Sequence, residues 1–592
     1  MKRLAALLVS VLLLAGLTAV SAQSQDDGGG KQTTFDIGDP QGIDSLNPLI
    51  GVTVAAYEAW NIQYATLTDK AASDFHTIPG LAESWKGSAD KRTWTYKLRP
   101  GLKWSDGKPL TSEDIAWTVN TSRDEEWINH SATVVNLTAT APDPETVVLK
   151  SSVDDPKLPT MDVYILPKHI WGPLGREGRD KYDAEDGVGS GPYVLEDFEK
   201  GQFARFRANP NYYKGKPSVD KVVLRKFNNP DAMVAALKSG ELDAAEDIPG
   251  SAFTQIEKDD DFEAVQGFQG AMSEVAINGG DGLKKPHPAL LDPVVREAIG
   301  HAIDKKTIVN RVLNGLGKPA ETLSVSPDPA WTPEIPQEDR FEFDLDKARQ
   351  MLEDAGYKDT DGDGVREMPN GGRPLNFRYA VRTDSETGPP TAEFVTGWLK
   401  EIGIATTRKT YDDGALTVAI GKGDYDIFAW GWTPFVDPDP MLSYFTCDMI
   451  ASDPEDPTNY YNDANYCDPE YDKLYQQQKV ELDRGKREEI VHEMLRRVQQ
   501  WGVYHVLYTY PDTQAYRKSA FEGFVKQPAN TGPVFYSNTS PSYSLMKAVT
   551  ASSSNDDGGG SAGIIAVIVL AVLALVGGLA WARRRRTADE RE

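Results

Sequence analysis

The stretch 424-DYDIFAWGWTPFVDPDPML-442 joins an apolar run to a Pro- and Asp-rich segment that can form neither a regular helix nor a regular strand. The run is bounded by breakers and predicts a buried strand, as do 93-TWTYKLR-99 and 503-VYHVLYTYP-511. Because successive strand residues point to opposite faces, Trp430 and Trp432 share one face. The sequence therefore places two large aromatic side chains on one surface beside an irregular loop.

Helix signals alternate with these strands. In 229-NPDAMVAALKSGELD-243, Asn229 can cap the helix, Pro230 suits its first position and Gly240 can end it. Similar signals predict helices over 292–313, 344–356 and 391–402. The alternation favours α/β lobes, and the length favours more than one lobe.

The two ends of the chain have the composition of targeting and membrane segments. Residues 1–22 combine a positive start, a short apolar run and small residues before a cleavage site, which is typical of a signal peptide; an N-terminal membrane anchor is the alternative. Residues 563–582 are long and apolar enough to span a membrane, with residues 550–562 as a flexible linker. Four arginines begin the tail, 583–592, and predict that it is cytoplasmic and that the body lies outside.

Composition and motifs argue against two functional classes. The 63 Lys and Arg against 89 Asp and Glu give a net charge of −26, which disfavours nucleic acid as a partner. A hydrolase is disfavoured because Val188 occupies a required glycine position of a G-x-S-x-G motif in 187-GVGSGP-192, and no H-E-x-x-H is present.

Cys447 and Cys467 are the only cysteines. In an oxidising compartment, two cysteines that bracket a short loop predict a disulfide, which would contribute about 3 kcal/mol in the chain-entropy model. Two free thiols are the alternative.

Six segments carry a resemblance to a known family. They are 79-PGLAESWKGSADKRTWTYKLRPGLKWSDGKPLTSEDIAWTVN-120, 166-LPKHIW-171, 189-GSGPYVLEDFEKGQFARFRANPNYYKGKPSVDKVV-223, 234-VAALKSGELDAAEDIP-249, 293-PVVREAIGHAIDKKTIV-309 and 468-DPEYDKLYQQQ-478. Together and in this order they resemble the family 5 extracellular solute-binding proteins, which include oligopeptide, dipeptide and nickel receptors of ABC importers.

The resemblance implies an α/β, two-lobed, periplasmic-binding-protein-like fold of class II, with an extra domain inserted in the first lobe. The expected ectodomain, 31–549, then has three parts. They are a first lobe of about 31–60, 190–281 and 509–549, an inserted subdomain of about 61–189, and a second lobe of about 282–508. Such proteins are not enzymes; they close around a solute by hinge motion and deliver it to permease subunits.

The resemblance also implies ligand-binding residues in the loop after Trp430 and Trp432. In peptide-binding members an Asp three residues after the Trp holds the ligand ammonium, and Phe435 occupies that position here. Either Asp437 substitutes, or the ligand has no free ammonium. Thr433 lines the same loop, and an aromatic wall offers about 1 kcal/mol per good stacking or cation–π contact. Packing of one tryptophan in the lobe core is the alternative.

Other ligand candidates follow from the same resemblance. Arg382 falls where dipeptide-binding relatives carry an arginine for the ligand carboxylate, although pairing with Asp384 on the surface is the alternative. Val52, Thr53 and Tyr57 lie in the N-terminal loop that lines the cleft, and Tyr57 could equally be core.

One loop has the spacing of a calcium site. In 359-DTDGDGVREMPN-370, Asp359, Asp361, Asp363 and Glu367 occupy ligand positions of an EF-hand-type loop, but position twelve is Asn370. A polar turn is the alternative, and any bound calcium would be structural. The seven histidines show no ligand-type spacing that would favour nickel.

These observations favour a membrane-anchored, monomeric, extracytoplasmic receptor of an ABC importer, with a small solute such as a peptide as ligand and no cofactor beyond possible structural calcium. A receptor for a sugar, opine or metal chelate, or a surface sensor, is the alternative, because the fold does not choose the ligand.

Overall fold

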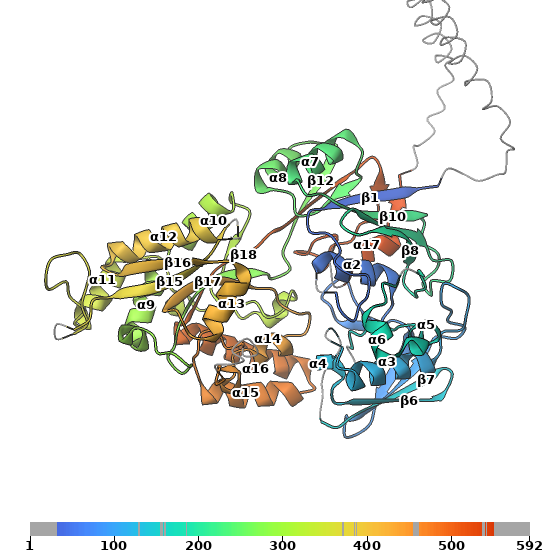
Figure 1. Ribbon diagram of the computed structural model, residues 1–592, viewed down its shortest axis with the longest axis horizontal. Coiled ribbons are helices and arrows are strands. Elements are labelled where there is room, and N and C mark those ends of the chain that lie inside the picture. Colours follow the sequence, from blue (N-terminus) through green and yellow to red (C-terminus); the bar gives the residue numbers. More distant parts are fainter. Residues whose placement is uncertain are drawn as a thin grey trace, which may run out of the picture. The chain divides into compact units, whose positions relative to one another are not determined.

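Two large mixed β-sheets organise the chain in the computed structural model (Figure 1). The structure describes residues 32–549 except 52, 128, 130, 154–157, 159, 160, 185, 370, 371, 384, 386, 454–460, 536–538 and 540. The predicted signal peptide, linker, transmembrane segment and tail all lie outside the described residues. Among the helices that are described, none combines the length and apolar character of a membrane span.

The first sheet has seven strands. Its parallel centre is β1, which pairs with β10 and β11, and the remaining pairings are antiparallel. In spatial order the strands are β12 (Phe262–Gly267), β19 (Asp512–Arg517), β11 (Ala244–Ala245), β1 (Thr34–Asp39), β10 (Lys221–Lys226), β9 (Phe203–Ala208) and β8 (Tyr193–Glu199). The accompanying helices are α2 (Val54–Gln63), α7 (Pro230–Ser239), α8 (Gly250–Ile256) and α17 (Pro541–Leu545), with the strand pair β20 (Phe521–Glu522) and β21 (Lys547–Ala548).

The segment between α2 and β8 forms a two-stranded sheet, a four-stranded sheet and a hydrophobic cluster of its own. The cluster includes Tyr96 and Leu98, which alternate with exposed residues on β5 as the sequence pattern predicts. The strands are β2 (Thr68–Lys70) and β3 (Thr77–Pro79), then β4 (Ala82–Gly87), β5 (Thr93–Leu98), β7 (Thr146–Ser151) and β6 (Leu137–Asp143). The helices are α3 (Ser112–Asp124), α4 (Ser131–Val134), α5 (Lys168–Trp171), η2 (Gly172–Leu174) and α6 (Gly175–Asp180).

The second sheet has six strands and belongs to the second lobe. In spatial order they are β14 (Lys318–Pro319), β18 (Tyr504–Thr509), β13 (Met272–Ile277), β17 (Ile427–Trp432), β15 (Asn376–Arg382) and β16 (Ala405–Tyr411). The expected start of this lobe at about residue 282 is too late, because Met272 already pairs within its sheet. The chain crosses between the two sheets at residues 268–271 and again at 510–511.

The second lobe is rich in helices, and two of its predicted helices can be compared with the structure. Asp344 caps α11 through a bond from the Lys347 amide, as predicted. The helix expected over 292–313 is instead two helices, because Ile303 is extended and Asp304 caps the second one. The helices are α9 (Pro293–Ala302), α10 (Lys305–Val312), α11 (Leu345–Asp354), α12 (Gly388–Glu401), α13 (Asp413–Gly421), α14 (Asp439–Ser443), α15 (Pro469–Val480) and α16 (Arg484–Trp501). Four short 3-10 turns lie in the described part of this lobe: η3 (Pro288–Leu291), η4 (Pro329–Trp331), η5 (Gln337–Asp339) and η6 (Cys447–Met449).

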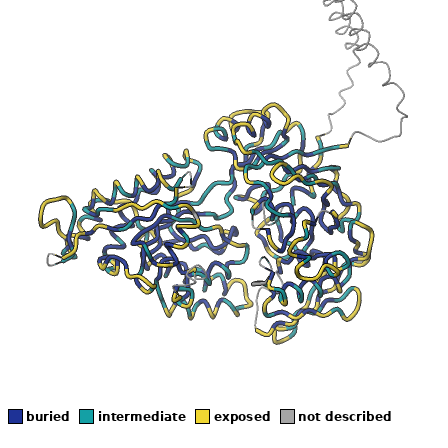
Figure 2. The backbone as a smooth tube through the Cα atoms, viewed as in Figure 1, coloured by how far each residue is buried: buried dark blue, intermediate teal, exposed yellow. Residues whose placement is uncertain are grey.

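Burial follows this architecture. Figure 2 shows buried backbone along the strands and exposed backbone on outer helices and loops.

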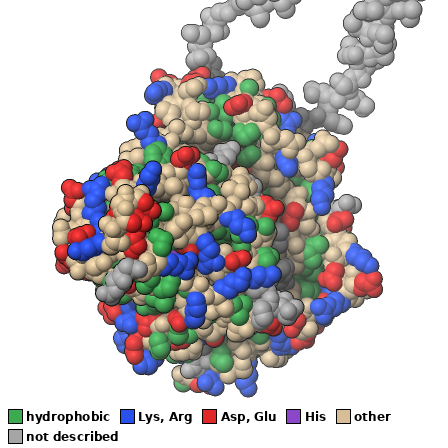
Figure 3. All heavy atoms as spheres, turned by 60° about the vertical axis from the view of Figure 1, so that its left-hand side comes forward, with side chains coloured by type: hydrophobic (Ala, Val, Ile, Leu, Met, Phe, Trp, Pro, Cys, Tyr) green, Lys and Arg blue, Asp and Glu red, His purple; other side chains and the backbone are tan. Residues whose placement is uncertain are grey.

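Cys447 and Cys467 form the predicted disulfide, with their Cα atoms 4.7 Å apart. Figure 3 shows Lys and Arg side chains interspersed with Asp and Glu side chains over one face.

Candidate functional site

The end of β17 carries an aromatic wall formed by Trp430 and Trp432. In the antiparallel pairing with β13, Trp430 lies opposite Glu274 and Trp432 lies opposite Met272. Residues two apart on a strand share a face, as the sequence predicts, and both indoles are half-buried.

Arg382 lies against this wall. Strands β15 and β17 are parallel, with Tyr379 opposite Ile427, so the same register brings Arg382 level with Trp430. The guanidinium carbon is 5.6 Å from the centre of the Trp430 ring, within cation–π range. The structure thus brings together two residues that the sequence placed far apart.

Trp432 packs more deeply than Trp430. Its ring is 5.4 Å from Tyr444 and 6.2 Å from Phe445, and Tyr444 stacks on Tyr461 at 4.8 Å. Tyr461 is 44% exposed, so the stack runs from the core to the surface. Trp432 therefore combines the core role and the wall role that the sequence analysis left open.

The loop after β17 presents exposed and paired side chains in turn. Thr433 is exposed and Phe435 is 45% exposed. Asp437 accepts two hydrogen bonds of 2.7 Å from Arg487, whose side chain is only 6% exposed. Arg487 also donates to Gln478 at 3.0 Å. The carboxylate that was predicted to hold a ligand ammonium thus has a cationic partner within the protein.

A pocket lies between the lobes beside this loop, and its volume is about 190 Å³. The second lobe contributes Asp437 and Trp331, whose ring lies 5.2 Å from the Arg487 guanidinium and 5.4 Å from that of Arg484. The segment between α2 and β8 contributes Lys70, at the end of β2, and residues 75–77, which lead into β3. This interlobe pocket combines aromatic surface with charges of both signs, which suits a solute that is partly apolar and partly ionic.

The N-terminal loop has mainly structural contacts. Thr53 caps α2 and donates to Asp44 at 2.8 Å. Tyr57 donates to Asn129 at 2.7 Å and contacts Trp60 edge-on at 4.8 Å, and burial raises its pKa. Val52 lies outside the described residues.

Carboxyl groups gather where β1 and β11 end. Burial raises the pKa of Asp39 to about 6 and of Asp512 to about 7. Glu58, which accepts from the Tyr543 hydroxyl at 2.8 Å, has its pKa raised to about 7, mainly by burial. The donors to these groups are neutral: Gln269 binds Asp512 at 2.9 Å. The negative charge of this edge of the first lobe therefore depends on pH, because its carboxyl groups gain or lose protons near neutral pH.

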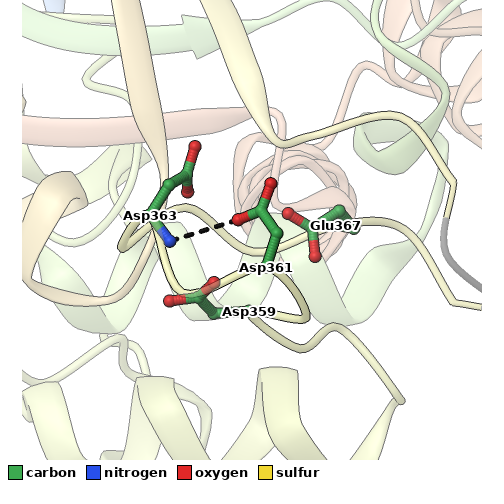
Figure 4. A group of neighbouring side chains, drawn as sticks. All are labelled: Asp359, Asp361, Asp363 and Glu367. Carbon is green, nitrogen blue, oxygen red and sulfur yellow. Dashed lines mark hydrogen bonds between the residues drawn. The ribbon is translucent and has the colours of Figure 1, made fainter.

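The calcium-like loop brings its acidic groups together (Figure 4). One oxygen from each of Asp359, Asp361, Asp363 and Glu367 lies within 4.8 Å of the others. Glu367 already accepts from the Thr360 amide at 2.8 Å, and Asp361 accepts from the Asp363 amide at 3.1 Å. These bonds also hold a polar turn without metal, so calcium binding stays a prediction.

Sequence reasoning missed the residues that support the loop and wall. Arg487 lies in a run of charged residues that resembles a solvated helix face, and no local pattern marks it as buried. Glu274 and Asp463 are buried acids in apolar or mixed segments. An acidic residue inside an otherwise apolar strand was the one available signal, at Glu274.

Comparison with known proteins identifies the family of the chain. Residues 76–451 match the model of the bacterial extracellular solute-binding proteins, family 5. The chain belongs to this family. The family 5 chain is 27% identical over 512 residues to the oligopeptide-binding protein AppA of Bacillus subtilis, covering 84% of this chain and 90% of the relative. It is 25% identical over 421 residues to the nickel-binding periplasmic protein of Escherichia coli, covering 68% and 76%.

Solved structures share the fold of this family 5 protein. AppA from Bacillus subtilis in complex with a nonapeptide matches with a TM-score of 0.68 and 24% identity, over 88% of this chain and 100% of that one. NikA from Brucella suis with Fe(III)-EDTA matches with a TM-score of 0.72 and 22% identity, over 86% and 99%. The two-lobed α/β fold expected from the sequence is confirmed.

Proposed function

We propose that this family 5 protein captures a peptide or peptide-like solute in the interlobe pocket and delivers it to the permease subunits of an ABC importer. The observation that carries the proposal is the pocket itself, which is lined from both lobes and lies beside the loop that follows the aromatic wall. One relative, the oligopeptide-binding protein AppA of Bacillus subtilis, is matched over 90% of its length.

The ligand's two ends would meet different surfaces. Arg382 would bind a carboxylate, because its guanidinium lies beside Trp430 at the end of β15. Asp437 would bind the ammonium of a ligand only if its ion pair with Arg487 were broken. A solute without a free ammonium avoids that exchange, which favours a blocked or internal segment of peptide over a free N-terminus.

The location of the protein is part of the proposal. The apolar segment 563–582 would anchor the protein in the cell membrane with the lobes outside. The protein would act as a monomer and would have no role in catalysis. The linker would let the lobes reach the permease.

The test is native mass spectrometry of the purified full chain, followed by denaturation to identify released molecules. Co-purifying peptides support the proposal, and thermal-shift titration then ranks them. Arg382→Ala is expected to lose most of the shift, whereas Arg408→Ala on the neighbouring strand β16 is the matched control and is expected to keep it. Binding of sugars or chelates alone would replace the peptide assignment.

A further inference from the structure

Two carboxyl groups that keep unpaired oxygens lie in the core of the second lobe. Glu274 is 0% exposed and Asp463 is 7% exposed. Among the described residues, neither oxygen of Glu274 nor Oδ2 of Asp463 has a hydrogen-bond partner, and the buried indole Nε1 of Trp432 also lacks one. Most buried side-chain polar atoms in proteins are hydrogen-bonded, so three such groups together need an explanation.

The strand register brings these groups to the face that carries the aromatic wall. Glu274 lies opposite Trp430 on β17, and therefore shares a face with Trp432. Asp463 reaches the same face through Tyr504, which lies opposite Ala276 and donates a hydrogen bond to Oδ1 of Asp463. Because Glu274 and Ala276 are two apart, their side chains point the same way.

The groups that face the pair are neutral donors. Tyr504 of β18 and Tyr425, just before β17, both donate to Asp463, through its carboxylate and its carbonyl respectively. Burial raises the pKa of both tyrosines well above its ordinary value, so they stay protonated at neutral pH. The charges of Arg378 and Asp426, which act on Tyr425, form an ion pair with each other at 2.9 Å.

Among the described groups that shift the pKa values of Glu274 and Asp463, no cation faces the two carboxyls. The two carboxyls must therefore retain a proton. Burial raises the pKa of Glu274, and the neighbouring charge of Asp463 raises it further, while the nearby indole N–H of Trp432 lowers it without reaching hydrogen-bond geometry. Burial raises the pKa of Asp463 to about 7. Two close carboxylates in a low-dielectric interior cannot both ionise cheaply, so they titrate as a pair.

We propose that Glu274 and Asp463 form a proton-binding pair that holds Trp432 in the aromatic wall, and that loss of the proton displaces Trp432 and weakens solute binding. Protonated, the pair is compatible with the packing of Trp432 on Tyr444 and Phe445. Ionised, it places a buried charge beside the indole, and the proton passes to solvent with no other bond changed.

The link from Trp432 to solute rests on the proposed function, but the link from proton to Trp432 does not. By thermodynamic reciprocity, a solute that favours the protonated wall raises the proton affinity of the pair. If the pKa of the pair is about one unit higher in the solute-bound protein than in the free protein, solute binds about tenfold more weakly above the titration range than below it.

The experiment follows tryptophan fluorescence of the full chain between pH 5 and 9. Trp432→Phe isolates the contribution of Trp432 from that of the other tryptophans by difference. We expect this contribution to titrate near neutral pH in the parent, and to become flat at its low-pH value in Glu274→Gln and Asp463→Asn, which mimic the protonated groups. Asp243→Asn removes a carboxyl of the first lobe whose pKa burial raises to about 6, and is the matched control that keeps the titration.

Three results each overturn a part of the proposal. A Trp432 contribution that does not change with pH in the parent removes the proton link, and this parent measurement stands even if an amide variant fails to fold. A titration that persists when Glu274→Gln and Asp463→Asn are combined in one protein removes the assignment to this pair. Equal affinity for a bound peptide at pH 6 and pH 8 overturns the link to binding. Because fluorescence needs no solute, its outcome is distinct from failure of the proposed function.

Discussion

The ion pair between Asp437 and Arg487 tests whether the loop after β17 is a fixed part of the second lobe. We expect Arg487→Leu to destabilise the protein. The substitution removes two charge-assisted bonds of 2.7 Å to Asp437 and one bond of 3.0 Å to Gln478, and leaves both partners without their cation. Asp437→Asn is expected to have a similar cost, because it leaves a guanidinium that is 6% exposed without its carboxylate.

The magnitude follows from burial. Breaking a buried ion pair typically costs about 3–5 kcal/mol, and the 23% exposure of the Asp437 side chain puts this pair near the lower end. For a unit of about 500 residues, an unfolding entropy of about 2.1 cal/mol/K per residue sums to about 1 kcal/mol/K, so a loss of about 3 kcal/mol lowers Tm by about 3 °C.

Urea denaturation of the two single variants and the double variant provides the assay. The double variant is expected to lose about 3 kcal/mol, well short of the sum of the single losses, which gives a coupling energy of about 2–3 kcal/mol. Lys486→Leu changes an exposed neighbour on α16 and is expected to stay within about 0.5 kcal/mol. A coupling below about 0.5 kcal/mol would refute the argument that the pair fixes the loop, and would return Asp437 to the role of ammonium acceptor.

The disulfide, the acidic loop, the aromatic wall and the first-lobe carboxyls each have a measurable consequence. Cys467→Ser is expected to lower the free energy of unfolding by about 3 kcal/mol, and an unchanged urea midpoint contradicts this. Calcium is expected to raise Tm of the parent but not of Asp361→Asn; an equal rise, or none in the parent, removes the metal site. Trp430→Ala is expected to weaken binding of a co-purified solute about fivefold, the equivalent of about 1 kcal/mol, in calorimetric titration, with Trp430→Phe between it and the parent. Glu58 has a folded-state pKa raised to about 7 from 4.5, so the stability it contributes is fully present below pH 4.5 and is lost as pH rises through 7. Glu58→Gln is therefore expected to flatten the fall of Tm over this range, and an unaltered slope argues against that pKa.

Local signals predicted a helix well where residues at both of its ends mark where it begins and where it stops. Asn229 accepts from two amides of α7 and Gly240 ends the helix at φ 82°, as their residue types imply. The break at Asp304 was missed because the apolar spacing continues through it. The sheet assignment of β13 was missed for a related reason: all six of its residues are buried, so no alternation shows which sheet it joins.

The candidate site was only partly predictable because its geometry depends on contacts across long stretches of chain. The tryptophan face follows from alternation alone, but the approach of Arg382 requires the parallel pairing of β15 and β17. The partner of Asp437 lies 50 positions along the chain, on a helix that begins with exposed charged residues. A sequence pattern carries no information about such a pairing until the tertiary packing is known.

The two halves of the aromatic wall have supports that respond differently to pH. Trp430 lies against Arg382, whose guanidinium stays charged at any pH at which the protein folds. Trp432 lies beside Glu274 and Asp463, whose charges change with pH. Loss of the proton therefore removes the support of Trp432, whereas the charged partner of Trp430 remains in place. A solute held mainly by its carboxylate would be retained, while one that depends on aromatic contact with Trp432 would be released, so pH would change which solutes bind more than whether the protein binds at all.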